Sequence, residues 1–145
     1  FRRRNIGIIY QFYNLIPILS VKENITLPLL LDNKTIDEKL LDDTIKYVGL
    51  ERRVNHLPNE LSGGEQQRVS IARAIITKPL LILADEPTGN LDTKRSKEIM
   101  DLLKKYNKEY NQTIILITHD LNVAKEADRI ITIEDGKIIK DEVDK

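Results

Sequence analysis

Residues 80–87 read Leu-Leu-Ile-Leu-Ala-Asp-Glu-Pro, and the fold is decided by this stretch. Its first five residues form an uninterrupted apolar run, which is typical of a strand buried on both faces of a parallel sheet. Asp85 and Glu86 follow the run directly, and open α/β sheets bind their ligands at the carboxyl ends of strands. The stretch therefore predicts a buried strand that ends in a pair of carboxylates. The pair alone is a weak signal, because two acids at a strand end also suit contact with water.

Apolar residues elsewhere along the chain alternate between strand-like runs and helical spacing. The strand-like runs are residues 6–10 and 113–118, and the helical patterns cover residues 35–49, 62–78 and 93–110. The first helical pattern opens with Thr35-Ile36-Asp37-Glu38, whose capping-box form predicts Thr35 as the N-cap. Asp135-Gly136 lies between two β-branched runs and is a strong hairpin signal. Strands that alternate with helices favour an α/β fold with a mostly parallel sheet and crossover connections.

Residues 13–78 are mainly helical in pattern, and we expect them to form a lobe inserted into the sheet domain. The chain then divides into a first core segment at residues 1–12, this helical lobe, and a second core segment at residues 79–145. Within the lobe, Pro17 and Pro28 are expected to break the chain into short pieces.

The composition excludes several classes of protein. The 145 residues include 23 Lys+Arg and 23 Asp+Glu, so the formal net charge is zero, which argues against a strongly basic nucleic-acid binder. The chain has no Cys, and therefore no disulfide framework, thiolate metal site or cysteine nucleophile. The longest apolar runs are far shorter than the roughly 20 residues that a membrane-spanning helix needs.

A second chemical signal is Ser62-Gly63-Gly64-Glu65, at the expected start of the helix over residues 62–78. Ser62 and Glu65 form a capping box, which is enough to explain both residues as an ordinary helix start. Two glycines in the first turn, however, weaken a helix by roughly 1 kcal/mol each relative to Ala. They leave backbone N–H groups open to a phosphate at the positive end of the helix dipole. We favour the anion-binding interpretation.

Polar residues also follow the two other predicted strands. His119 comes directly after residues 113–118, as Glu86 comes after its own strand, so neighbouring strands would bring both to one edge of the sheet. Gln11 follows the first strand and could reach a metal or a water molecule at that edge. Taken alone, His119 and Gln11 are each more typical of polar residues at the end of a strand that have no catalytic role.

Five motifs, in this order, resemble those of the ATPase subunit of ATP-binding cassette (ABC) transporters. They are the Q-loop (Gln11), the signature motif (Leu61 to Gln66), the Walker B strand with its catalytic Glu (Leu80 to Glu86), the D-loop (Gly89 to Asp92) and the switch histidine (His119). The resemblance covers essentially the whole chain. The sequence of residues 83–92 resembles that of the family branch that contains lipoprotein-releasing, macrolide-exporting and antimicrobial-peptide-exporting systems.

The resemblance implies a partial P-loop NTPase fold of the RecA type with an inserted helical subdomain, and it assigns roles at the sheet edge. By that resemblance, Asp85 coordinates Mg²⁺ and Glu86 is the general base that activates water. His119 contacts the γ-phosphate of ATP, and Gln11 senses the metal and the attacking water. These roles suit phosphoryl transfer, which depends on positioning and charge stabilisation.

The resemblance also implies partners. Cassettes of this family hydrolyse ATP in a head-to-tail dimer, in which the signature motif of one subunit holds the γ-phosphate of ATP on the other. The residues that would do so here are Ser62, Gly63, Gly64 and Gln66. Asp92 would bridge the two subunits. The dimer would drive a membrane permease from the cytoplasmic face of the cell membrane and would bind no nucleic acid, and these motifs do not encode the transported substrate.

One motif of the family is absent from the sequence. No G-x-x-x-x-G-K-[ST] loop, the Walker A motif that forms most of the phosphate cradle, occurs among the 145 residues. The chain begins with Phe1, just before the Q-loop strand, so we expect the C-terminal two-thirds of an ATPase without its N-terminal strands and P-loop. Such a fragment is predicted to bind little ATP, to hydrolyse none, and to self-associate through uncovered apolar faces and strand edges.

Two other functions remain open. An ABC-type ATPase outside transport, such as a DNA-repair or ribosome-associated relative, shares the signature and Walker B patterns. The DNA-repair relatives insert a long coiled coil between these motifs, however, whereas only about 50 residues separate Gln11 from Leu61 here. The chain could also be a non-catalytic module that lends its signature motif to a complete cassette.

Overall fold

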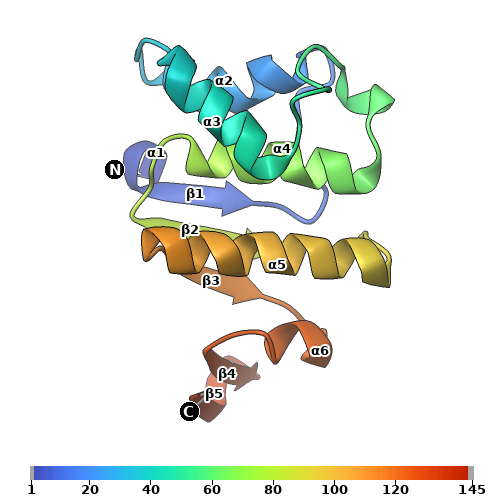
Figure 1. Ribbon diagram of the computed structural model, residues 1–145. Helices are drawn as coiled ribbons and strands as arrows, with labels where there is room; N and C mark the ends of the chain where they lie inside the picture. Colours follow the sequence, from blue (N-terminus) through green and yellow to red (C-terminus); the bar gives the residue numbers. More distant parts are fainter. Residues whose placement is uncertain (1, 144–145) are drawn as a thin grey trace.

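The computed structural model describes residues 2–143, and its elements follow the predicted alternation of strands and helices (Figure 1). In chain order they are α1 (Arg2–Asn5), β1 (Ile6–Ile9), α2 (Val21–Leu31), α3 (Glu38–Val48), the short 3₁₀ helix η1 (Pro58–Glu60), α4 (Gly63–Ile75), β2 (Leu81–Asp85), α5 (Thr93–Tyr110), β3 (Thr113–Ile117), α6 (Leu121–Ala124), β4 (Arg129–Glu134) and β5 (Lys137–Val143). The three strands that the sequence predicts are present as β1, β2 and β3. The expectation that they are buried on both faces is wrong, because β1 and β2 have buried residues on one face only and β3 has none.

β1, β2 and β3 form a parallel sheet in that order. Ile9 near the end of β1 pairs with Ala84 of β2, and Asp85 at the end of β2 pairs with Ile117 of β3. Because the strands are parallel and in this register, the residues that follow them emerge at one edge of the sheet. The predicted α/β class with a mostly parallel sheet is confirmed.

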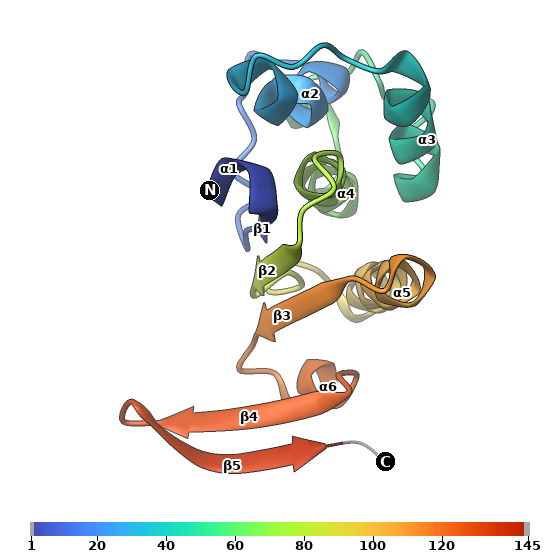
Figure 2. The same ribbon diagram turned by 90° about the vertical axis from the view of Figure 1, so that its left-hand side faces the viewer.

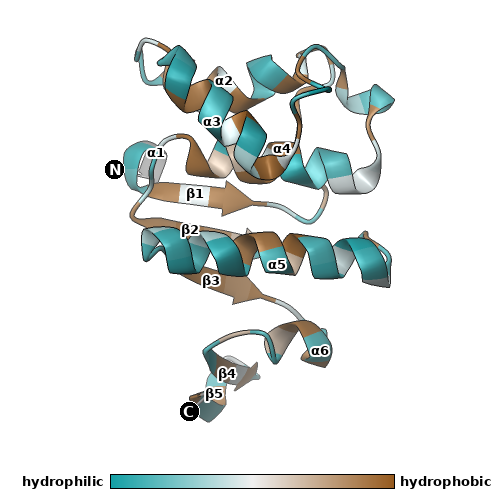
Figure 3. Cartoon of the chain, viewed as in Figure 1, coloured by the Kyte–Doolittle hydropathy of each residue, from teal (hydrophilic) through white to brown (hydrophobic). Residues whose placement is uncertain are grey.

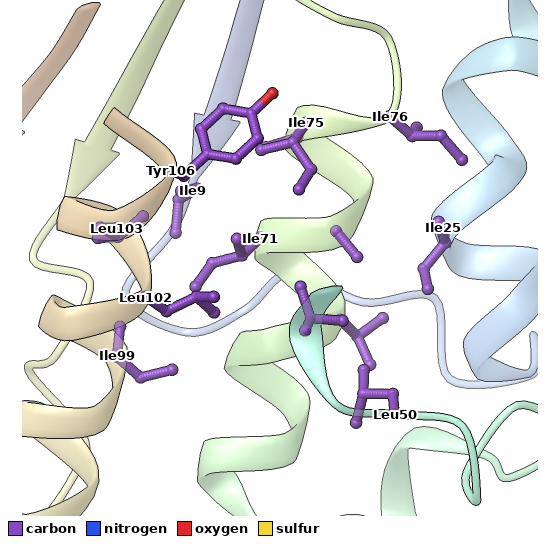
Figure 4. Packing of buried hydrophobic residues seen from close by; sticks show 14 of the residues in the cluster. Ile9, Ile25, Leu50, Ile71, Ile75, Ile76, Ile99, Leu102, Leu103 and Tyr106 are labelled. Carbon is purple, nitrogen blue, oxygen red and sulfur yellow. The ribbon is translucent and has the colours of Figure 1, made fainter. Parts of the chain in front are cut away.

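One face of the sheet is covered by α4 and α5, which lie on the same side of the strands in Figure 2. Figure 4 shows Ile71 of α4 close to Leu102 of α5, with Ile9 of β1 beside them. Ile9 and Ile82 are fully buried in this layer. Since removal of apolar surface from water is the main favourable term in folding, this layer is the core of the chain.

The opposite face of the sheet is apolar and has no described helix along β2 and β3 (Figure 2). Alternation along each strand places there the side chains of Ile6, Ile8, Leu81, Leu83, Ile115 and Ile117. Figure 3 shows β3 as a hydrophobic ribbon, and Ile115 and Ile117 are 50% and 58% exposed. The sheet therefore has one packed face and one apolar face open to solvent.

α4 lies between the sheet and the helical region (Figures 1 and 2). α2 and α3 both pack on α4, on the side away from β1. Its buried residues consequently lie on several sides of the helix rather than on a single stripe, and they are Gly64, Gln67, Val69, Ser70, Ile71, Ala72, Ala74 and Ile75. A helix that is enclosed by neighbours on two sides has little need of a polar face.

Two local predictions in the helical region are wrong. Pro28 does not break the chain, because α2 continues through it from a capping box formed by Ser20 and Glu23. The burial of Ile25 and Leu29 against the core offsets the hydrogen bond that proline removes. Thr35 is not the N-cap of α3 either: the Asp37 carboxylate accepts the backbone N–H groups of residues 39 and 40. A charged acceptor is favoured over a hydroxyl at the positive end of a helix.

The C-terminal hairpin stands apart from this core. β4 and β5 pair antiparallel around Asp135 and Gly136, as predicted, and form a separate two-stranded sheet. Figure 2 shows the hairpin extending away from the parallel strands. Within residues 2–143, no helix has both the length and the apolar character needed to cross a membrane.

Candidate functional site

Glu86 and His119, which follow β2 and β3, are in direct contact. Nδ1 of His119 lies 2.6 Å from Oε1 of Glu86, and the backbone N–H of His119 donates to the same oxygen at 2.9 Å. The Thr118 hydroxyl donates to the other carboxylate oxygen at 3.2 Å. The adjacent, parallel arrangement of β2 and β3 creates this contact. The structure thus brings together two residues that lie 33 positions apart in the sequence.

The backbone of Glu86 adopts an uncommon conformation. Its φ angle is +45°, in the left-handed region that residues other than glycine rarely enter. The Glu86 N–H donates to the Ile117 carbonyl at 2.8 Å, which ties this residue to the end of β3. Strained residues of this kind cluster at functional sites. The Glu86 side chain is only 16% exposed, whereas that of His119 is 86% exposed, so a ligand would meet the histidine first.

Asp85 is the last residue of β2, and its side chain is exposed. Its carboxylate forms no hydrogen bond or ion pair with another side chain of residues 4–143, so both oxygens are available to a ligand. Mg²⁺ prefers oxygen ligands and is usually held by one or two carboxylates together with water and substrate phosphates. The described part of the chain has no group of three or more acidic, His or Cys side chains that could hold a metal alone. Asp85 therefore fits Mg²⁺ that shares its coordination sphere with a nucleotide.

Gln11 lies against the loop that follows β2. A Cβ atom added to Gly89 would be 2.6 Å from Nε2 of Gln11, so this side chain rests directly on the glycine backbone. The Asn90 side-chain amide also donates to the backbone carbonyl of Gln11 at 3.1 Å. The loops after β1 and β2 are thereby joined at the same sheet edge as Asp85 and Glu86. Any larger residue at position 89 would displace Gln11.

Ser62 is the N-cap of α4. Its hydroxyl oxygen accepts the Glu65 N–H at 3.2 Å, and the Glu65 carboxylate accepts the Ser62 N–H at 3.1 Å, which confirms the capping box. Ser62 is exposed, and its hydroxyl proton remains available for donation. Gly63 and Gly64 are approached closely by the side chains of Tyr13 and Arg95 respectively. The glycines thus have a packing role in addition to the open backbone that the sequence suggests.

The Glu65 carboxylate has a second partner. Nε of Arg53, in the loop after α3, lies 2.7 Å from Oε2 of Glu65. Partial burial acts to raise the pKa of Glu65, but the hydrogen bonds from Arg53 and Ser62 outweigh it and hold that pKa below its usual value. Glu65 is therefore a charged, doubly bonded group at the start of the helix.

Two further predicted residues are engaged locally. The Gln66 side-chain amide turns back and donates to the Leu61 carbonyl at 3.3 Å. Asp92 is the N-cap of α5, where its carboxylate accepts the Arg95 N–H at 2.8 Å and pairs with the Arg95 guanidinium. The hydrogen bond to the Arg95 backbone is the main reason why the pKa of Asp92 is lowered.

Comparison with known proteins identifies the family of the chain. A sequence profile of the family described as "ABC transporter" matches residues 1–89. The chain belongs to the ABC transporter family. Residues of the Q-loop, the signature motif and the Walker B strand all lie within the matched region.

Several relatives are similar over almost the whole chain. The chain is 43% identical to the lipoprotein-releasing system ATP-binding protein LolD of Cytophaga hutchinsonii, with 96% of the chain and 64% of LolD covered. It is 47% identical to the ABC transporter ATP-binding protein MJ0796 of Methanocaldococcus jannaschii, with 97% and 63% covered. The dimeric MJ0796 structure bound to ADP and Pi superposes with a TM-score of 0.84 at 45% identity, covering 98% of this chain and 64% of that chain. The chain thus spans just under two thirds of the length of these relatives.

Sequence reasoning missed two residues that connect the family motifs. Gln67 of α4 is fully buried, and its side-chain amide donates to the carbonyl oxygens of Tyr10 and Pro87. Arg73, two turns further along α4, donates to the carbonyls of Tyr13 and Asn14 at 2.9 and 2.8 Å. Both residues occur as polar positions in an expected helix, and no local pattern indicates that they reach the Q-loop.

Arg73 also accounts for an unusual backbone. Tyr13 and Asn14 both have positive φ angles, and the Arg73 guanidinium bonds the carbonyl of each. Burial lowers the pKa of Arg73, since the charged form is partly removed from water. Charge-assisted bonds to two carbonyls hold the Q-loop on the helix that begins with the signature motif.

Proposed function

We propose that this chain is the greater part of the ATP-binding subunit of an ABC transporter, which powers a membrane permease by ATP hydrolysis. The family match and the likeness to LolD and MJ0796 support ATP as the substrate. The single observation that carries the catalytic assignment is the contact between Glu86 and His119 at the ends of adjacent strands.

Each residue at the sheet edge has a distinct role in this proposal. Glu86 accepts a proton from the attacking water, and its bonds to Thr118 and His119 orient the carboxylate for that task. His119 is exposed and donates to the γ-phosphate. Asp85 and Gln11 would hold Mg²⁺, which would supply charge stabilisation to the phosphates when bound. Gln11 reports the state of the site to the helical region through the loop that it begins.

The start of α4 serves a second subunit. Ser62, Gly63, Gly64 and Gln66 hold the terminal phosphate of ATP on the partner cassette, with the helix dipole and the Ser62 hydroxyl as donors. The similar structure of MJ0796 is a dimer bound to ADP and Pi, which supports pairing between cassettes. Asp92 lies at the same surface and bridges the two subunits after release from Arg95. The permease would keep the protein at the inner face of the cell membrane.

A second candidate is a pairing module without catalysis of its own. The observation that favours it is a complete signature motif with an exposed Ser62, in a sequence without any G-x-x-x-x-G-K-[ST] loop. Such a chain lends Ser62 and its glycines to the ATP of a complete cassette.

An ATPase measurement tests the catalytic assignment. We expect no turnover above background from the purified chain, because the Walker A cradle is not among its 145 residues. Turnover that the Glu86→Gln substitution abolishes would contradict this expectation. In a longer cassette that includes a P-loop, Glu86→Gln should lower the hydrolysis rate by about 10²-fold or more while ATP binding persists. Equal turnover before and after that substitution would reject Glu86 as the general base.

Self-association is expected from the open face of the sheet. Ile115 and Ile117 belong to a continuous apolar surface that extends over all three parallel strands. Exposed apolar patches of this kind drive association. Light scattering at increasing concentration should therefore show species larger than the 16.8 kDa monomer. A monodisperse monomer across the whole concentration range would contradict the expectation.

A further inference from the structure

The phosphate-binding end of α4 carries a negative charge of its own. Glu65 occupies the third position of the helix, and its Oε1 lies 3.1 Å from the Ser62 backbone nitrogen. A phosphate held by the Ser62 hydroxyl and the glycine amides would therefore stand within a few ångströms of a carboxylate. Two like charges at such a separation repel strongly wherever water is partly excluded. The site needs a compensating cation.

Arg53 is placed to be that cation. The two oxygens of Glu65 are divided between two partners, Oε1 for the Ser62 N–H and Oε2 for Nε of Arg53 at 2.7 Å. The turn that carries Arg53 is itself fixed, because its N–H donates to the Leu50 carbonyl and its carbonyl accepts the His56 N–H, both at 2.9 Å. Leu50 is buried. The Arg53 guanidinium therefore approaches Glu65 from a turn that is held by backbone hydrogen bonds.

Two other cations near this end of the helix, Arg95 and Arg68, are paired with acids of their own. The Arg95 side chain packs against Gly64, but its guanidinium forms an ion pair with Asp92. Arg68 of α4 pairs with Glu98 of α5. The hollow beside Glu65 adds one acid and one base, Glu51 and Arg52. The local charges therefore cancel, and loss of Arg53 would leave one uncompensated negative charge at the helix start.

We propose that Arg53 is a positioning residue that neutralises Glu65 so that the start of α4 can accept the phosphate of a nucleotide held by a partner cassette. The inference rests on the proposed pairing function. It goes beyond that function by placing a requirement on a residue outside the signature motif, in the loop between α3 and η1. The pair is partly exposed, with side chains 43% and 29% accessible, so its loss should leave the fold intact.

A purely structural ion pair makes different predictions. If the pair only fastens the loop to the helix, removal of either partner disrupts it, and the two single variants should behave alike. If Arg53 serves to cancel Glu65, the partners are unequal. Arg53→Gln exposes a carboxylate to the phosphate, whereas Glu65→Gln removes the repulsion and keeps a side-chain oxygen for the Ser62 N–H. The double variant should then recover.

The test uses this chain with the MJ0796 cassette as partner. The chain carries a fluorescent label at its amino terminus, and association is followed by anisotropy with and without Mg²⁺ and a non-hydrolysable ATP analogue. We expect the analogue to promote association of the wild-type chain. Arg53→Gln should weaken the analogue-dependent association by about tenfold or more, and Arg53→Lys, which keeps the charge, by much less. The double variant Arg53→Gln/Glu65→Gln should return to within about twofold of wild type.

Lys39→Gln is the matched control, since Lys39 forms an equally simple surface pair with Asp43 on α3. It should bind as wild type does, and circular dichroism should show that every variant is folded. Equal weakening by Arg53→Gln and Glu65→Gln without recovery in the double variant would overturn the inference and leave a structural ion pair. Wild-type affinity for Arg53→Gln would overturn it as well. Absence of analogue-dependent association for the wild-type chain would instead reject the pairing function, and the inference with it.

Discussion

α4 and the β4–β5 hairpin are both rich in apolar residues, yet they end in opposite environments. α4 is enclosed by the sheet on one side and by α2 and α3 on the other. Most of the hairpin isoleucines are exposed, with Ile133 and Ile138 65% and 66% exposed. The hairpin therefore depends on strand pairing and on its turn, whereas α4 depends on long-range contacts. The functional loops are attached to α4 and not to the hairpin.

The difference shows why the site is built around α4. Gln67 and Arg73 project from this helix to the Q-loop and to the loop after β2, and Ser62 begins it. A helix held on two sides is a rigid support for such contacts. A two-stranded hairpin alone is marginally stable in water and could not position them.

The largest expected effect contrasts one isoleucine from each region. Ile71→Ala on α4 should lower the free energy of unfolding by about 3 kcal/mol, because Ile71 is 1% exposed and its loss leaves a cavity in the core. Ile133→Ala in the hairpin should change it by no more than about 0.5 kcal/mol. Urea unfolding followed by circular dichroism measures both. Equal losses would mean that the hairpin packs on the core in solution.

The next prediction concerns the attachment of the Q-loop to α4. Arg73→Met should destabilise the chain by about 2 kcal/mol, because two carbonyls lose charge-assisted donors. It should also raise hydrogen exchange in residues 11–16. Arg73→Lys, which can reach fewer acceptors, should have an intermediate effect. Arg129→Met in the hairpin is the control. If hydrogen-exchange protection of residues 11–16 stayed at the wild-type level in the Arg73→Met variant, the proposed attachment would be wrong.

How far local sequence signals reach can be judged on the same two regions. The hairpin follows from Asp135-Gly136 alone, and the meeting of Glu86 with His119 follows from the rule that parallel strands end at a common edge. The turn is visible in the residues themselves, whereas the meeting at the sheet edge required β2 and β3 to be neighbours, which the structure shows.

The contacts of α4 could not be predicted in this way. Gln67, Arg73 and the Arg53–Glu65 pair join segments that are 12 to 60 residues apart, and their side chains resemble ordinary polar positions. The passage of α2 through Pro28 has the same origin, since burial in a tertiary core overrides a local preference. Local patterns thus predict elements, and tertiary packing decides which polar side chains reach the site.

A smaller effect is expected from two glycines in left-handed conformations. Gly49 ends α3 with φ +74°, and Gly136 turns the hairpin with φ +75°. A Cβ would fit sterically at either position, so the cost of Gly→Ala is conformational, about 1 kcal/mol. Gly49→Ala should lower the global free energy of unfolding by that amount. Gly136→Ala should reduce hydrogen-exchange protection in the hairpin only, and a matching global loss would show that the two regions unfold together.

The smallest effect is a difference in acid sensitivity. The backbone hydrogen bond from Arg95 is the main cause that lowers the pKa of Asp92, and the Arg129 side chain likewise lowers that of Asp141 in the hairpin. A carboxylate whose pKa is lowered by folding stabilises the folded state above its ordinary pKa of 3.8, and this contribution disappears as the pH falls through the folded value. Asn at position 92 keeps the N-cap acceptor but does not titrate. In the Asp92→Asn variant, the free energy of global unfolding should therefore depend less steeply on pH below about 4.

Asp141→Asn should leave that global profile unchanged and alter only the hairpin, because Asp141 and Arg129 contact each other across β4 and β5. Thermal unfolding between pH 3 and pH 7, monitored by circular dichroism for the whole chain and by hydrogen exchange for residues 129–143, separates the two responses. If Asp141→Asn flattened the global acid profile as much as Asp92→Asn did, the hairpin would belong to the same cooperative unit as α4 and α5. The expected result is the opposite: acid acts on the packed region through the cap of α5, and on the hairpin through its own cross-strand pair.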